Sequence, residues 1–106
     1  MEKYQDVFYD CIDAYGMDAQ IEQAKEEMYE LLMAFRRLQT NKDDKKVSDV
    51  ITNVQEEIAD VIIMMEQMKL IFGTESVNQF IEAKLLRQRE RLRIRNEVQS
   101  RNMQGL

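Results

Sequence analysis

The sequence contains no histidine, proline or tryptophan, and its only cysteine is Cys11. Without histidine, the chain has no Ser–His–Asp triad, no histidine-ligated zinc site and no Glu-x-x-His di-iron centre of the ferritin-like kind. The single cysteine excludes an internal disulfide and favours a reducing, cytoplasmic location. Because proline is absent and only three of the 106 residues are glycine, we expect a nearly all-helical chain. Because histidine is absent, any catalytic chemistry is expected to depend on carboxylates.

Long hydrophobic runs are absent as well. The most apolar stretch, residues 61–65, is too short to span a bilayer, and no basic N-terminal segment precedes an apolar one. We therefore expect a soluble protein with no membrane partner. A chain of this length fits one domain but buries only a modest part of its surface alone, so association between chains is expected.

Apolar periodicity and glycine positions predict two helices in the first part of the chain. The first is expected over residues 3–14, followed by Gly16 in a left-handed cap position. The second is expected to begin at Asp18, as its N-cap, and to continue to residue 38. Residues 41–46 are polar and charged, which is typical of a connecting loop.

Two further helices are expected after this loop. The third begins between residues 48 and 52, where Thr52 has capping-box spacing, and it ends at Gly73. The fourth is capped by Thr74 or Ser76 and reaches residue 98, while residues 99–106 are expected to fray.

Four helices with short connections predict an all-α fold, an antiparallel helical bundle within a single domain over residues 1–98. In the third helix, residues 61–65 are all apolar and point nearly all round the helix axis. We therefore expect this helix to be central and to contact both the second helix and a second subunit. The helix pairs would thus be completed by oligomerisation.

The same pattern of carboxylates occurs twice, thirty residues apart. Its members are Glu26, Glu27 and Glu30, then Glu56, Glu57 and Asp60. The apolar frame repeats with it, since Ile21, Ala24, Met28, Leu31, Leu32 and Phe35 correspond to Ile51, Val54, Ile58, Val61, Ile62 and Met65. At about 100° per residue, each apolar set forms one stripe with two acids along its edge. Packing of the two stripes would bring four acids together, which is costly unless a cation or protons compensate.

This repeat predicts a metal site made of oxygen ligands only. Such ligands suit hard cations, and the acids lie on helices rather than in the loop of an EF-hand, so Mg²⁺ is preferred, with Mn²⁺ as a substitute. The rival interpretation is a non-catalytic helical-bundle interaction protein in which these six acids are ordinary solvated charges.

Positive charge is concentrated in the last predicted helix. Residues 1–75 carry 17 acids and 8 bases, whereas residues 76–106 carry 3 acids and 7 bases. Lys84, Arg87 and Arg91 fall on one face, which could bind phosphate oxygens, while Arg93 and Arg95 are expected on other faces. The alternative is a solvated face that pairs with the acidic surface. A nucleic acid polymer is not an expected partner, because the net charge is −5 and no aromatic residues interleave with the bases.

The acidic motifs resemble those of a known family. Glu-Glu-Met-Tyr-Glu at residues 26–30, followed by Glu-Ile-Ala-Asp at residues 57–60, resembles the EExxE and ExxD signature of the MazG-like all-α nucleoside triphosphate pyrophosphohydrolases. The surroundings are similar too, because Gln20-Ile21 precedes the first motif and Lys84 opens a basic helix after the second. The resemblance covers about residues 18–92, a single minimal copy of a domain that longer members duplicate or extend.

The resemblance implies Mg²⁺-dependent hydrolysis of a nucleoside triphosphate to the monophosphate and pyrophosphate by metal-activated water, without a covalent nucleophile. It also implies a dimer or tetramer. The implied metal ligands are Glu27, Glu30, Glu57 and Asp60; Glu26 or Glu56 would be an outer-shell group or the proton acceptor; Lys84, Arg87 and Arg91 would bind phosphate. Gln20 and Gln23 could contact the base or merely pack. Which nucleotide is preferred stays open.

Overall fold

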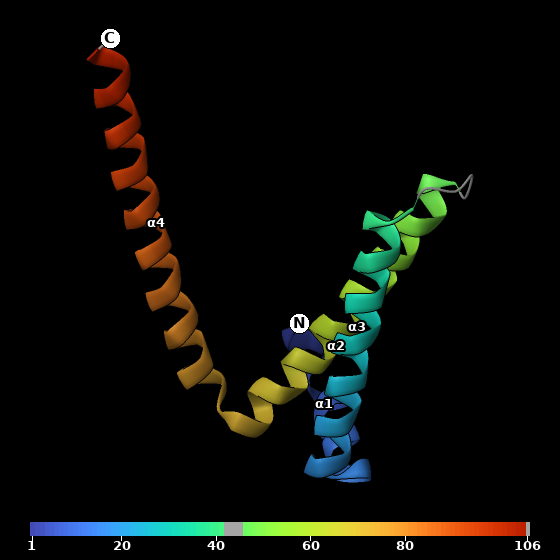
Figure 1. The fold of residues 1–106 in the computed structure, drawn as a ribbon. Helices are drawn as coiled ribbons and strands as arrows, with labels where there is room; N and C mark the ends of the chain where they lie inside the picture. Colours follow the sequence, from blue (N-terminus) through green and yellow to red (C-terminus); the bar gives the residue numbers. More distant parts are fainter. Residues whose placement is uncertain (42–45, 106) are drawn as a thin grey trace. The chain divides into compact units, whose positions relative to one another are not determined.

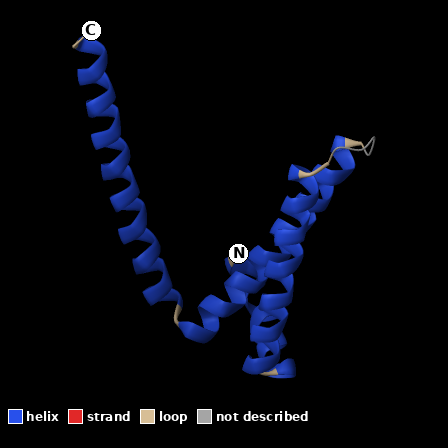
Figure 2. Cartoon of the chain, viewed as in Figure 1, coloured by secondary structure: helices blue, strands red, loops and turns tan. Residues whose placement is uncertain are grey.

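The computed structural model describes residues 1–41 and 46–105, and nearly all of them are helical. A short 3₁₀ helix, η1 (Glu2–Tyr4), is followed by the α-helices α1 (Gln5–Tyr15), α2 (Met17–Gln39), α3 (Val47–Phe72) and α4 (Thr74–Gln104). These residues contain no strand (Figure 2), so the predicted all-α fold is confirmed. Within the same residues, no helix combines the length and the apolarity needed to cross a membrane.

The chain forms two compact units, Met1–Phe72 and Gly73–Leu106. In the first unit, α2 and α3 lie side by side and run antiparallel, as the predicted bundle requires (Figure 1). Helix α1 contacts both of them. The second unit consists of α4. A single domain over residues 1–98 stays a prediction.

Gly16 ends α1 and begins α2, but not in the predicted conformation. Its φ of 88° and ψ of 160° lie outside the left-handed helical region, in a region that only glycine enters readily. Its N–H donates to the carbonyl oxygen of Ile12 at 2.8 Å, and its own carbonyl accepts from the N–H of Gln20 at 3.1 Å. The predicted N-cap at Asp18 is therefore wrong. Asp18 instead lies in the first turn of α2, where a negative charge is favourable.

The third helix ends at the predicted glycine but begins earlier than expected. It starts at Val47, and the Thr52 hydroxyl donates to the carbonyl of Ser48 at 2.8 Å from within the helix, so Thr52 is not a cap. Helix α4 has Gly73 as its N-cap rather than Thr74 or Ser76. It continues to Gln104, so residues 99–104, which were expected to fray, are helical.

Helices α2 and α3 meet along a line that differs from the predicted stripes. The members of this packed line, all buried or half-buried, are Gln20, Ala24, Glu27, Leu31 and Ala34 on α2, and Val50, Val54, Glu57, Val61 and Met64 on α3. The two sets are again offset by thirty residues, so the internal repeat presents equivalent faces of the two helices to each other. Small Ala24 and Ala34 allow a close approach on α2. As a result, Met28, Leu32 and Phe35 of the predicted stripe remain exposed.

Helix α4 exposes large apolar side chains along its whole length. No residue of Thr74–Gln104 is buried, and the exposed side chains include Phe80, Leu85, Leu92 and Ile94. Most helical stability in proteins comes from packing of an apolar face rather than from helix propensity. We therefore expect α4 to pack against another helical surface.

Candidate functional site

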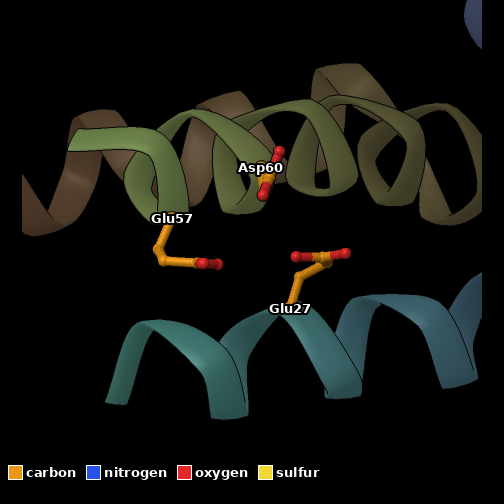
Figure 3. Close-up of side chains that lie close together, drawn as sticks. All are labelled: Glu27, Glu57 and Asp60. Atoms are coloured by element: carbon orange, nitrogen blue, oxygen red, sulfur yellow. The ribbon is translucent and has the colours of Figure 1, made fainter. Parts of the chain in front are cut away.

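Three carboxylates from two helices meet between α2 and α3. Glu27 comes from α2, Glu57 and Asp60 come from α3, and one oxygen of each lies within 4.8 Å of the others. In Figure 3, the side chains of Glu27 and Glu57 extend into the space between the helices and Asp60 lies next to them. The structure thus brings together three of the four acids that the sequence suggested as metal ligands. We call these three residues the acidic cluster.

Helical spacing explains why these acids converge. Glu27 follows buried Ala24 by three residues and Glu57 follows buried Val54 by three, which places both glutamates on the packed line. The sequence analysis placed both glutamates at the edge of an apolar stripe and expected the stripes to form the contact; in the structure the contact is shifted toward the acids, so that both glutamates are half-buried within it. Asp60 follows Glu57 by one further turn and lies beside the packed line, where it is exposed.

Partial burial and the neighbouring carboxylates raise the proton affinity of Glu57. Partial burial, followed by the negative charges of Asp60, Glu30 and Glu27, raises the pKa of Glu57 above its ordinary value, and the positive charge of Arg37 opposes this shift. Glu30 is therefore close enough to act on Glu57, although it does not belong to the acidic cluster. A carboxylate in this environment is stabilised by a proton or by a cation.

The donor set fits a hard divalent cation. All the groups are carboxylates, and Mg²⁺ in proteins uses one or a few carboxylates together with water and substrate oxygens. Half-burial of Glu27 and Glu57 restricts their side chains, while exposed Asp60 leaves one side of the acidic cluster open to solvent. The acidic cluster could therefore hold an ion that also contacts a ligand from solution.

The other acidic and amide candidates lie around the acidic cluster in different ways. Glu26 and Glu56 are exposed, about 100° round their helices from Glu27 and Glu57. Gln23 donates from Nε2 to Oε1 of Glu27 at 2.7 Å. Gln20 is buried, and its Nε2 donates to Oε1 of Gln67. In this structure Gln23 orients Glu27 and Gln20 joins α2 to α3; contact of either residue with a base stays a prediction.

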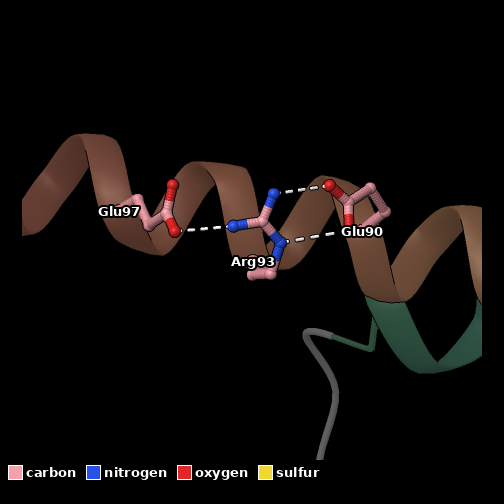
Figure 4. A network of polar contacts seen from close by, with 3 residues as sticks. All are labelled: Glu90, Arg93 and Glu97. Carbon is pink, nitrogen blue, oxygen red and sulfur yellow. Dashed lines mark hydrogen bonds and ion pairs between the residues drawn. The ribbon is translucent and has the colours of Figure 1, made fainter.

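The basic candidates lie on α4, in the second unit. Lys84, Arg87 and Arg91 are exposed on one face of a continuous helix. Arg95 follows Arg91 by four residues and shares this face, so its expected placement elsewhere is wrong. Arg93 faces another direction and is held by Glu90 and Glu97, each with a contact of 2.6 Å (Figure 4). The hydrogen bond from Arg93 lowers the pKa of Glu90.

Two residues near the acidic cluster were missed by the sequence analysis. Nη2 of Arg37 on α2 donates to Oδ1 of Asn53 on α3 at 2.9 Å. Arg37 follows Glu30 by seven residues, and Asn53 precedes Glu57 by four, so both belong to the helix faces that carry the acids. This spacing is present in the sequence, but neither residue stands out there, because the basic residues are concentrated in α4.

No protein-family model, curated protein or solved structure matches this chain. The resemblance to the MazG-like family therefore rests on the two acidic motifs of the sequence alone.

Proposed function

We propose that this chain is a Mg²⁺-dependent nucleoside triphosphate pyrophosphohydrolase, which converts a (d)NTP into the (d)NMP and pyrophosphate. The observation that carries the proposal is the acidic cluster, because two motifs thirty residues apart in sequence place three carboxylates within 4.8 Å of one another. Convergence of like charges is unfavourable in the absence of a cation. Acids that only kept the surface soluble would not need to converge in this way.

In this proposal, Glu27, Glu57 and Asp60 hold the metal ion and Glu30 supports them. When bound, Mg²⁺ or Mn²⁺ would neutralise phosphate charge and lower the pKa of a water molecule. Gln23 keeps the Glu27 carboxylate oriented through its hydrogen bond. Glu26 or Glu56, each exposed and next in sequence to a member of the acidic cluster, would accept the proton of the attacking water.

The remaining roles follow the same proposal. Lys84, Arg87 and Arg91 present a positive face that would bind phosphate oxygens through charge-assisted hydrogen bonds. Gln23, and Gln20 if the hydrogen bond to Gln67 opens, would contact the base. The substrate would be a nucleotide of the cytoplasm.

We further propose that the chain associates with itself into a dimer or tetramer. Six exposed apolar residues flank the packed line on one side: Met28, Leu32, Phe35, Ile51, Ile58 and Ile62. On each helix the packed line lies between these residues and the flank that carries Glu30 on α2 or Asp60 on α3. Because α2 and α3 are antiparallel and present equivalent faces to each other, equivalent flanks of the two helices lie on the same side of the pair, and the six apolar residues lie together on the side away from Glu30 and Asp60. We call them the apolar face.

The size of the buried core supports self-association. In the described residues the buried apolar side chains are Phe8, Ala24, Ala34, Val50, Val54 and Met64. A core of this size, with two alanines among its members, contributes little stability by itself. A second copy covering the apolar face would supply the missing burial and would leave the acidic cluster open.

A non-catalytic helical interaction protein is the second candidate. The apolar face and the exposed apolar residues of α4 favour it, because surfaces of this kind bind other helices. Both candidates need these surfaces, so the test must address the acidic cluster.

The deciding experiment is pyrophosphate release from a panel of NTPs and dNTPs. With Mg²⁺ or Mn²⁺ we expect pyrophosphate and monophosphate in equal amounts, and none after chelation. Asp60→Asn should abolish release, while Glu22→Gln should not, since Glu22 pairs with Lys25 on an exposed part of α2. Absence of release by the parental chain from every nucleotide would favour the interaction protein.

A further inference from the structure

Arg37 stands out because its charge acts on Glu57 of the acidic cluster while its side chain is held by a neutral group. Its positive charge acts on Glu57, and its Nη2 donates to the Asn53 amide oxygen at 2.9 Å. None of the ion pairs within residues 1–41 and 46–105 involves Arg37. If it served only to neutralise the acids, a direct pair with Glu30 or Glu57 would be the expected arrangement. Among the described residues, the Arg37 guanidinium is therefore held in place by an amide oxygen and not by a carboxylate.

The internal repeat shows that this charge is placed at one end of the acidic cluster only. Arg37 corresponds to Gln67 under the thirty-residue offset. Gln67 is buried and accepts a hydrogen bond from Gln20, so a neutral pair occupies one end. At the equivalent position of α2, the exposed side chain of Arg37 is positively charged. The acids of the two motifs correspond to each other, Glu27 to Glu57 and Glu30 to Asp60, whereas the positive charge of Arg37 has no counterpart at Gln67.

A guanidinium has five N–H donors in a planar fork that matches the oxygens of a phosphate group. The hydrogen bond to Asn53 uses one donor and limits the rotation of the side chain. A polyphosphate carries more negative charge than one divalent ion neutralises, so a fixed cation next to the metal site would bind its remaining oxygens. Arg37 also belongs to the same unit as the acidic cluster, residues 1–72.

We propose that Arg37, held by Asn53, binds phosphate oxygens of the polyphosphate whose metal ion the acidic cluster holds. Arg37 is then a substrate-binding residue and Asn53 is its positioning residue. This inference rests on the proposed function, since it requires a metal-bound polyphosphate at the acidic cluster. It adds to that function a phosphate-binding group within the unit that carries the acids.

Two titrations of the purified full chain test the proposal, one with Mn²⁺ alone and one with a non-hydrolysable nucleoside triphosphate at saturating Mn²⁺. Arg37→Ala should weaken nucleotide binding by about tenfold to a hundredfold, as expected for a lost hydrogen bond to a charged group. The same variant should bind Mn²⁺ alone as tightly as the parental chain or more tightly, because a nearby positive charge is removed. Arg36→Ala is the matched control, since Arg36 is the adjacent exposed arginine about 100° round the helix.

Further variants separate binding from positioning. Asn53→Ala should weaken nucleotide binding less than Arg37→Ala, and Arg37→Lys should restore only part of the affinity, because lysine lacks the fork. Equal nucleotide affinity of the Arg37→Ala and Arg36→Ala variants, with a parental chain that binds nucleotide, would overturn the role of Arg37 and leave the proposed function standing. A parental chain that binds Mn²⁺ but no nucleotide would overturn both.

Discussion

At the scale of single residues, Glu57 is the group on which metal binding and stability depend in opposite ways. Partial burial and three neighbouring acids raise its pKa, so its negative charge is unfavourable in the folded chain when no cation is bound. The same charge would be favourable once a divalent cation is present. A substitution that removes the charge should therefore separate stability from function.

Glu57→Gln should leave the metal-free chain as stable as the parental chain or more stable, because repulsion with Asp60 and Glu27 is relieved. Mn²⁺ should raise the melting temperature of the parental chain by mass action and should not raise that of the variant. Pyrophosphate release should fall by at least about a hundredfold, beyond the usual effect of losing an outer-shell partner. Thermal melts with and without Mn²⁺, with Glu22→Gln as control, measure these effects. An equal Mn²⁺ shift in both chains would remove Glu57 from the proposed ligands.

The raised pKa of Glu57 also predicts the sign of a pH effect. Its folded-state pKa lies above the ordinary value of 4.5, so the folded chain binds this proton more tightly than the unfolded chain does. Its contribution to stability is fully present below the unfolded pKa and is lost as pH rises through the folded pKa. Urea unfolding of metal-free protein at a series of pH values should show this loss in the parental chain and not in Glu57→Gln. Identical pH profiles would contradict the shift.

Glu90 should show the opposite dependence. The hydrogen bond from Arg93 lowers its pKa, so the stability it contributes is present above its unfolded pKa and is lost as pH falls through the folded value. The two carboxylates can be distinguished by urea unfolding across pH. Glu90→Gln should change the pH dependence of the free energy of unfolding only below the ordinary pKa of 4.5, whereas Glu57→Gln should change that dependence above this value.

At the scale of the elements, the glycines fix where the helices end. Gly16→Ala should destabilise the chain by about 1–3 kcal/mol, because alanine would have to adopt a φ of 88° with a ψ of 160°. A Cβ at this position would meet no atom within 4 Å, so the cost comes from the backbone alone. Gly105→Ala is the matched control, since Gly105 has a φ of −76° that alanine adopts easily. Urea unfolding of the two variants at the same protein concentration measures the difference. Equal midpoints for Gly16→Ala and Gly105→Ala would contradict the expected backbone strain at residue 16.

The sequence predicted the helices well because period and glycine position are local signals. The end of α3 at Gly73 and the all-α fold follow from them directly. The face by which α2 and α3 meet was less predictable, because Ala24 and Ala34 carry a weak apolar signal yet permit the closest approach. The larger Leu32 and Phe35 dominated the predicted stripe and lie outside the contact.

The acidic site was predicted for a related reason. The repeated motifs place Glu27, Glu57 and Asp60 at equivalent positions of α2 and α3. These acids therefore come together even though the contact between the helices is rotated by part of a turn from the predicted one. Arg37 and Asn53 were missed, because their hydrogen bond joins two helices and each residue alone is an ordinary polar side chain.

At the scale of the whole molecule, the apolar face determines how copies of the chain would meet. Ile62 belongs to this face, and the next residue, Ile63, lies about 100° further round α3. The two side chains are similarly exposed, at 44% and 41%, and are chemically identical. They therefore form a matched pair in which only the direction of the side chain differs.

We expect the parental chain to sediment as a dimer or tetramer at micromolar concentration. Ile62→Asp should shift it to a smaller species, since burying an unpaired carboxylate in an interface costs about 3–5 kcal/mol, which weakens association by more than a hundredfold. Ile63→Asp should retain the parental assembly. Circular dichroism of both variants shows whether the smaller species is still helical, and the addition of excess parental chain shows whether Ile62→Asp can be captured by an intact copy. A monomeric parental chain, or equal dissociation by both variants, would mean that the apolar face is not where two copies meet and that the small core of residues 1–72 must be completed in another way.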